Sequence, residues 1–324
     1  MSRRVLVVAN MWPSESRPAD GIFVKEQIDA LRRVAPDHDF DVLVLDTMRD
    51  RREYLRAPIR IARRVRQGYD VVHAHYGLVG SVAVAQRRAP VVTTFHGSDV
   101  NIPWQRRVSS LAARLSVRSI FVSKALRDRM GESARHPTVI PCGVDLDLFR
   151  PRARDAARAA LGIAPDRLLV VFPGHPDNPA KDYPLFEATL AALPESVRAR
   201  VDQRAITGLE RDEVALLLSG ADLLLLTSAR EGSPMVVKEA LACDTPVVAV
   251  DVGDAGELLA GVEGCRVVRG RNPALIAAAA AEVLVAPRVA NGARRGHLLE
   301  RALDADAIAR RVLEVYDDVV AGRR

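Results

Sequence analysis

Short apolar runs alternate with helix-like segments along the whole chain, and this alternation limits its fold more than any other feature. The runs are continuous in Val, Ile and Leu, which is typical of strands buried on both faces of a parallel sheet. In the first half we expect strands at residues 5–9, 41–45, 71–73, 91–95, 120–123 and 139–141. In the second half we expect them at 168–172, 204–207, 223–226, 247–250 and 266–268.

Helical patterns separate these runs, for example at residues 23–34, 125–130, 185–192, 212–219, 236–243 and 273–285. Strands and helices in alternation predict an α/β fold in which helices cover both faces of each sheet. Because the pattern restarts after a proline-containing segment at 149–166, we expect two Rossmann-like, doubly wound domains at 1–150 and 151–305. A last helix at 306–324 could pack on either domain. A cleft between the domains would be the default ligand site.

Composition excludes several classes of protein. The chain has 324 residues, of which 48% are hydrophobic and 27% charged, an ordinary globular balance. Its three cysteines form no C-x-x-C pair, so neither a disulfide scaffold nor a zinc site is expected. No apolar stretch reaches the ~18 residues of a membrane-spanning helix, and the first apolar run is too short for a signal peptide. The expected location is the cytoplasm.

Positive charge is concentrated in the first half of the chain. Residues 1–150 hold 25 Lys and Arg against 16 Asp and Glu, whereas residues 151–324 hold 22 against 25. The densest cluster is Arg49, Arg51, Arg52, Arg56, Arg60, Arg63, Arg64 and Arg66. This cluster is either a solvated arginine-rich face or a basic amphipathic surface that contacts the anionic inner face of a membrane. Nucleic acid is not the expected partner, because aromatic residues make up 4% of the chain and no aromatic stacking cluster accompanies the arginines.

The glycines carry no nucleotide-cofactor motif. No G-x-G pair occurs among the 20 glycines, which removes the dinucleotide fingerprint, and no P-loop is present. The motifs of zinc proteases and of serine hydrolases are also absent. We therefore expect no bound cofactor and no metal.

The segment 230–240 combines two carboxylates with the start of a helix. It follows an apolar run, and Ser233 and Pro234 are suited to the N-cap and first position of a helix. The first free amides of that helix could bind a diphosphate. Glu231 and Glu239, on either side of the helix start, could accept hydrogen bonds from sugar hydroxyls. Taken singly, both glutamates could equally be ordinary helix-surface charges.

These glutamates form an E-x7-E pattern, and in this respect the chain resembles retaining glycosyltransferases of family 4, which have the two-domain GT-B fold. Further matching landmarks are Asp-Val-Val-His-Ala-His at 70–75, Phe-His-Gly-Ser-Asp at 95–99, Val-Ile-Pro-Cys-Gly-Val-Asp at 139–145, and Lys181. The resemblance covers essentially the whole chain. It is strongest to short bacterial enzymes of teichuronic acid or other surface-polysaccharide assembly.

The resemblance implies a role for each matching residue. His96, Lys181 and Glu231 would be catalytic: His96 and Glu231 would hold the transferred sugar, and Lys181 would neutralise the leaving diphosphate. The implied donor-binding residues are Gly21, His175, Gly232, Ser233, Pro234, Met235 and Glu239, with Glu239 on the ribose. Asp99 and Ser123 would lie on the acceptor side. His175 stands where the family usually has an arginine, and its charge depends on pH in a way that an arginine's does not.

The implied activity is transfer of a hexose from a nucleotide-diphosphate sugar to an acceptor, without a metal. The acceptor would be a lipid-linked or surface-polysaccharide intermediate or a small molecule. Two alternatives remain open: a nucleotide-sugar epimerase of the same fold, and a catalytically weak binding or partner protein that keeps the fold.

Overall fold

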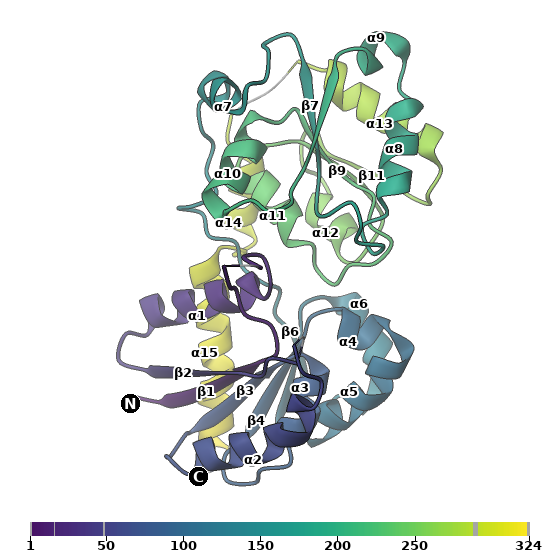
Figure 1. Ribbon diagram of the computed structural model, residues 1–324. Helices are drawn as coiled ribbons and strands as arrows, with labels where there is room; N and C mark the ends of the chain where they lie inside the picture. Colours follow the sequence, from purple (N-terminus) through teal and green to yellow (C-terminus); the bar gives the residue numbers. More distant parts are fainter. Residues whose placement is uncertain (1, 16, 48, 288–290, 323–324) are drawn as a thin grey trace. The chain divides into compact units, whose positions relative to one another are not determined.

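The computed structural model describes residues 2–15, 17–47, 49–287 and 291–322. The chain forms two compact units (Figure 1). The first comprises Met1–Gly143 together with Ala305–Arg324, and the second comprises Val144–Asp304.

The first unit is built on a six-stranded parallel sheet. Its strands are β1 (Arg4–Ala9), β2 (Asp39–Val44), β3 (Val71–His75), β4 (Val91–Phe95), β5 (Arg118–Phe121) and β6 (Pro137–Val139), in the order β2-β1-β3-β4-β5-β6. Every pairing is parallel. All six strands expected in this half are present, and β3 and β4 are buried along their whole length. This burial explains their continuous apolar sequence.

Helices cover both faces of this sheet. Val5 and Val7 of β1 face α1 (Ile22–Val34) and α15 (Ala305–Ala321). Leu6 and Val8, which alternate with them, face α2 (Glu53–Val65) and α3 (Gly77–Ala83). On the same side as α3 lies α5 (Pro103–Leu115), which packs directly against it (Figure 1). The shorter elements of this unit are α4 (Ser98–Asn101), α6 (Lys124–Met130) and the 3-10 helix Gly131–Ser133.

The second unit repeats this plan on a five-stranded parallel sheet. Its strands are β7 (Leu168–Phe172), β8 (Val201–Ala205), β9 (Leu223–Leu226), β10 (Val247–Val250) and β11 (Arg266–Val268), in the order β11-β10-β9-β7-β8. One sheet face is covered by α10 (Arg211–Gly220) and α11 (Met235–Ala242), and the other by α8 (Tyr183–Ala191) and α13 (Pro273–Val285). The remaining helices are α7 (Arg154–Leu161), α9 (Glu195–Arg198), α12 (Ala255–Leu259) and α14 (Ala293–Glu300).

The unit boundary lies before the prolines that suggested a linker. The second unit begins at Val144, and Val144 and Phe149 are fully buried in its core. The first unit therefore ends at Gly143 instead of near residue 150, because packing of these two side chains, not the proline content, decides which unit the segment joins. The last helix, α15, packs on α1 in the first unit. Within the described part of the chain, every helix is too short or too polar to cross a bilayer.

Candidate active site

Two loops of the second unit are hydrogen-bonded to each other at the carboxyl ends of adjacent strands. One loop follows β7 and the other follows β9. The N–H of Ala229 donates to the carbonyl of Ala180 at 2.8 Å. The hydroxyl of Thr227 donates to the carbonyls of Lys181 and Asp182 at 3.2 and 3.1 Å. These bonds fix the backbone that carries Lys181 against the backbone that leads to Glu231.

Arg271 also connects the same two loops. Its guanidinium donates to the carbonyls of Thr227 and Ser228 at 2.6 and 3.0 Å and forms an ion pair with Asp182. Asp182 in turn accepts the N–H of Leu185 at 3.2 Å, as the N-cap of α8. The turn that carries Lys181 and Asp182 is therefore held in place by hydrogen bonds on both sides.

Lys181 and Glu231, to which the family resemblance gave roles on the leaving diphosphate and on the transferred sugar, are in direct contact. The Nζ of Lys181 lies 2.8 Å from Oε1 of Glu231, and the two side chains are 22% and 14% exposed. Partial burial strengthens the attraction between these charges compared with a pair in open solvent. Both side chains are still partly exposed to solvent. A ligand could therefore separate them, with its phosphate binding Lys181 and its hydroxyls binding Glu231.

The start of α11 differs from the prediction by one residue. Pro234, not Ser233, is the N-cap, and no side chain caps the helix. The hydroxyl of Ser233 instead accepts a hydrogen bond from Nζ of Lys238 at 2.8 Å. The first-turn amides of Met235 and Val236 have no partner in the preceding turn, as expected at a helix N-terminus.

Lys238 is a buried residue that the sequence analysis missed. Its side chain is 0% exposed. The carboxylate of Asp254, the N-cap residue of α12, lies close enough to interact electrostatically with the Lys238 charge. Burial raises the pKa of Asp254, while the Lys238 charge and a hydrogen bond from Ser233 oppose that rise. The signal in the sequence was a single lysine among apolar residues in the helix that carries Glu239.

Glu239 is held by a second residue that the sequence analysis missed. The guanidinium of Arg211, at the start of α10, lies 2.7 Å from Oε1 of Glu239, and this glutamate side chain is 6% exposed. The same guanidinium stacks over the ring of Phe149, with 4.6 Å between its central carbon and the ring centroid. Glu239 is thus a buried carboxylate in the second turn of α11, held by a cation.

His175 lies in the loop after β7, upstream of Lys181. Its ring is exposed, and Nδ1 accepts the N–H of Asp177 at 3.1 Å and lies 3.6 Å from that residue's carboxylate. Gly174 beside it has φ +153°, and a Cβ there would come within 3.1 Å of the Lys181 side chain. The structure therefore places His175 in the loop that carries Lys181.

In the first unit, Gly21 makes a close approach that no other residue could make. It is the N-cap of α1 with φ +65°, and a Cβ there would lie 2.3 Å from the carbonyl oxygen of Met11. The glycine lets the loop after β1 pass directly over the start of α1.

Asp99 fixes the loop that contains His96. Its carboxylate accepts the N–H groups of Gly97, Gly77 and His96 at 2.8, 3.0 and 3.2 Å. The residue is completely buried, and burial raises the pKa of Asp99 while these three hydrogen bonds oppose the rise. Ser123, the other residue predicted on the acceptor side, is also buried, and its Oγ has no hydrogen-bond partner among the described residues.

The ring of His96 belongs to a cluster of histidines. Its Nε2 lies 3.0 Å from Nδ1 of His75, and its Nδ1 lies 3.9 Å from Sγ of Cys142. Burial lowers the pKa of His96 to about 3. The next histidine, His73, contacts Tyr316 of α15 at 2.6 Å. His73 and His75 are buried in β3, and His96 is neutral at physiological pH.

A cavity of about 520 Å³ opens in the first unit near the carboxyl ends of β1, β3 and β4. It lies among α2, α3 and α5 and is lined by Asn10, Met11, Thr47, Arg51, Tyr54, Tyr76, Leu78, Ser81, Val82, Ser98, Asp99, Trp104, Gln105 and Val108. Three aromatic rings and several hydroxyl and amide groups thus line one hollow. Nowhere in the described residues do three or more His, Cys, Asp or Glu side chains gather so as to hold a metal.

Comparison with known proteins finds two matching family models and similar sequences. Residues 4–148 match the model of Glycosyltransferase Family 4, and residues 187–286 match that of Glycosyl transferases group 1. A Bacillus subtilis protein named as a teichuronic acid biosynthesis glycosyltransferase, TuaC, is 26% identical, over 79% of this chain and 82% of that protein. The D-inositol 3-phosphate glycosyltransferase of Geodermatophilus obscurus is 31% identical, over 71% of this chain and 62% of that protein.

Solved structures show the same fold. Sucrose-phosphate synthase from Thermosynechococcus elongatus superposes with a TM-score of 0.78 at 19% identity, over 99% of this chain and 100% of that one. Anabaena HepE, solved in complex with UDP-glucose, superposes with a TM-score of 0.73 at 17% identity, over 98% and 100%. Two Rossmann-like units of this kind form the GT-B fold. More narrowly, the chain belongs to glycosyltransferase family 4.

Proposed function

We propose that this protein is a retaining glycosyltransferase that moves a hexose from a nucleotide-diphosphate sugar to an acceptor hydroxyl without a metal. The observation that carries the proposal is the contact between Lys181 and Glu231, 2.8 Å apart on two loops held together by hydrogen bonds. A cation and a carboxylate side by side suit a ligand that presents phosphate to one and sugar hydroxyls to the other.

The donor would occupy the second unit. Glu239 would accept hydrogen bonds from the ribose hydroxyls, and the amides at the start of α11 would contact the diphosphate. In the reaction the bond between the anomeric carbon and the diphosphate oxygen breaks, and a bond to the acceptor oxygen forms on the same face. The acceptor proton passes to the leaving phosphate oxygen. Lys181 and the helix N-terminus would stabilise the charge that develops on the diphosphate.

The acceptor would lie on the first unit, where we propose a lipid-linked or surface-polysaccharide intermediate. The cavity near Asp99 supports this, because the aromatic residues Tyr54, Tyr76 and Trp104 line it together with polar groups, a lining that suits a sugar. The similarity to TuaC, a protein named for teichuronic acid biosynthesis, points to the same class of acceptor. We propose that the protein works in the cytoplasm, at the inner face of the membrane.

Thermal unfolding with a panel of nucleotides tests the donor site. UDP, GDP, ADP and their sugar conjugates are each added at ~100 times an expected Kd, which stabilises a specific binder by ~2.7 kcal/mol. We expect one nucleotide family to raise the melting temperature, and HepE makes UDP the first candidate. NAD serves as the control. If no nucleotide raised the melting temperature, the result would favour a catalytically weak protein that keeps the fold.

Product analysis tests the reaction. With the donor so identified, transfer to a sugar acceptor should give the same anomeric configuration as the donor, read by NMR coupling constants. An inverted product would contradict the retaining assignment. Conversion of the donor without any acceptor would support the epimerase alternative.

A further inference from the structure

The outer face of α5 is an unusually large apolar stripe. Trp104, Val108, Leu111 and Leu115 recur at helical spacing and are 58%, 42%, 48% and 55% exposed. The buried face of the same helix carries only small residues: Ser109, Ala112 and Ala113. A surface helix normally turns its large apolar residues inward. Here they face outward, over a length of about 16 Å at 1.5 Å per residue.

A second apolar pair lies on α2, which packs against the other side of α3. Leu55 and Ile59, one helical turn apart, are 79% and 59% exposed. The cavity near Asp99 lies between the two helices, since Tyr54 of α2 and both Trp104 and Val108 of α5 line it. The α2 and α5 faces therefore adjoin the same opening.

Arginines that lack acidic partners accompany both apolar faces. By helical spacing, Arg107 and Arg114 flank the α5 stripe, and Arg52, Arg63 and Arg66 share the α2 face with Leu55. Within the described ranges none of these five guanidiniums has an ion pair. By contrast, Arg56, Arg60 and Arg64 of the same cluster pair with Asp50, Glu53 and Asp41. The unpaired positive charges thus lie where the apolar side chains are exposed.

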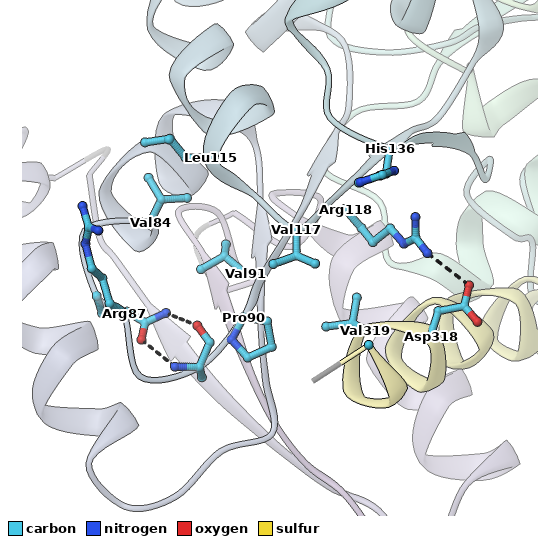
Figure 2. A pocket seen from close by; sticks show the side chains of 13 residues that line it. Val84, Arg87, Pro90, Val91, Leu115, Val117, Arg118, His136, Asp318 and Val319 are labelled. Atoms are coloured by element: carbon cyan, nitrogen blue, oxygen red, sulfur yellow. Dashed lines mark hydrogen bonds and ion pairs between the residues drawn. The ribbon is translucent and has the colours of Figure 1, made fainter. Parts of the chain in front are cut away.

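The far end of the stripe meets a second cavity, shown in Figure 2, at the amino ends of β4 and β5. Val84, Val91, Leu115 and Val117 form its apolar wall, and Arg118 and Asp318 lie 3.5 Å apart at its rim. Arg87, His136 and Asp318 in its lining are exposed, and nothing about it specifies a small ligand. This cavity extends the apolar surface of α5 to the amino ends of the strands.

We propose that the α2–α5 face, comprising the exposed side chains of these two helices, docks on an anionic lipid bilayer. An apolar stripe of this size inserts into the boundary between headgroups and acyl chains, and unpaired arginines beside it attract anionic headgroups. The α5 helix lies in the plane of the membrane, and the cavity near Asp99 opens beside it. Only the purpose of the docking rests on the proposed function. That purpose is to bring a lipid-linked acceptor to the cavity.

Co-sedimentation with vesicles tests the docking. The full chain is mixed with phosphatidylcholine vesicles and with vesicles containing 30% phosphatidylglycerol, at low and high salt. We expect binding to the anionic vesicles that weakens with salt, and a blue shift of the Trp104 fluorescence. The pair Leu111→Gln and Leu115→Gln should reduce binding at least tenfold. The pair Arg107→Gln and Arg114→Gln should reduce it about fivefold per arginine, at ~1 kcal/mol each.

The matched control is Leu275→Gln on α13 of the second unit, a leucine that is 56% exposed and should not affect binding. Melting temperatures of all variants confirm that they fold. Equal binding by wild type and the α5 variants would overturn the inference, as would a dimer in solution that the α5 variants dissociate.

The docking and the proposed function fail separately. Nucleotide-dependent stabilisation without vesicle binding would overturn the docking surface and leave the donor site intact. Vesicle binding without any nucleotide effect would overturn the proposed function and leave the docking surface intact.

Discussion

Nζ of Lys181 lies 2.8 Å from Oε1 of Glu231, although 50 residues separate them in the chain. The contact exists because β7 and β9 are neighbours in a parallel sheet, so the loops after them leave from the same edge. Arg271 and Thr227 hold these loops together through backbone carbonyls. The chemistry proposed for the pair therefore depends on hydrogen bonds that do not involve either side chain.

Replacing Lys181 should lower the transfer rate more than it lowers stability. Lys181→Ala removes the charge that would balance the leaving diphosphate, so we expect kcat to fall by about 10²–10³. Glu231→Ala should abolish transfer with the fold intact. The matched control is Lys25→Ala, which removes a 2.7 Å ion pair with Asp29 on the exposed side of α1. A Lys181→Ala enzyme with normal turnover would refute the assigned role.

Arg211→Ala should weaken nucleotide binding and leave the rate at saturating donor largely unchanged. Without Arg211, the buried carboxylate of Glu239 loses the cation that holds it at 2.7 Å. We expect Kd for the nucleotide to rise about tenfold, a change of ~1.4 kcal/mol, as titration calorimetry would measure. Arg152→Ala, which removes an exposed pair with Asp212 near the start of the same helix, is the control. Equal affinity in the two variants would show that Arg211 does not position Glu239.

Gly21→Ala should destabilise the protein far more than Gly68→Ala. Both glycines have positive φ, +65° and +83°, so each substitution carries about 1–2 kcal/mol of left-handed strain. A Cβ at residue 21 would also lie 2.3 Å from the carbonyl of Met11, whereas one at residue 68 meets no atom within 4 Å. We expect urea unfolding to show a loss of more than ~3 kcal/mol for Gly21→Ala. Similar losses would mean that the loop after β1 moves freely.

Stability should fall as the pH is lowered from about 6.5 towards 3. Burial lowers the pKa of His73 to about 3, whereas an unfolded histidine titrates near 6.5. Between these values the unfolded chain binds more protons at this position than the folded one. The free energy of unfolding therefore decreases as the pH is lowered through this range. The decrease is up to ~1.4 kcal/mol per pH unit for one histidine.

His73→Gln should make this slope shallower, because the amide can still bond Tyr316 and Thr94 but binds no proton. Urea unfolding at several pH values between 4 and 8 would measure it. His175→Gln, at an exposed histidine, is the control. An unchanged slope in His73→Gln would place the acid sensitivity elsewhere in the molecule.

Local sequence patterns predicted the strands and most helices, whereas the candidate catalytic residues came from the resemblance to a family. Continuous apolar runs can be buried only between two helical layers, so an α/β fold with parallel sheets followed directly. The start of the helix that carries Glu239 was predictable from Ser233 and Pro234, which follow an apolar run. The sequence misplaced the N-cap of α11 by one residue, and the hydroxyl of Ser233 instead bonds the buried side chain of Lys238.

Long-range packing decided what the pattern left open. The sequence gives no sign that Arg211 meets Glu239, or that α15 returns to the first unit, since both contacts join distant segments. The residues Trp104, Val108, Leu111 and Leu115 have the spacing of a core-facing stripe, yet they lie outside. Close packing of α5 on α3 admits only small side chains: a Cβ at Gly80 would lie 2.9 Å from that of Ala112. Periodicity shows that a helix has an apolar face, but the space available beneath the helix decides whether that face is buried.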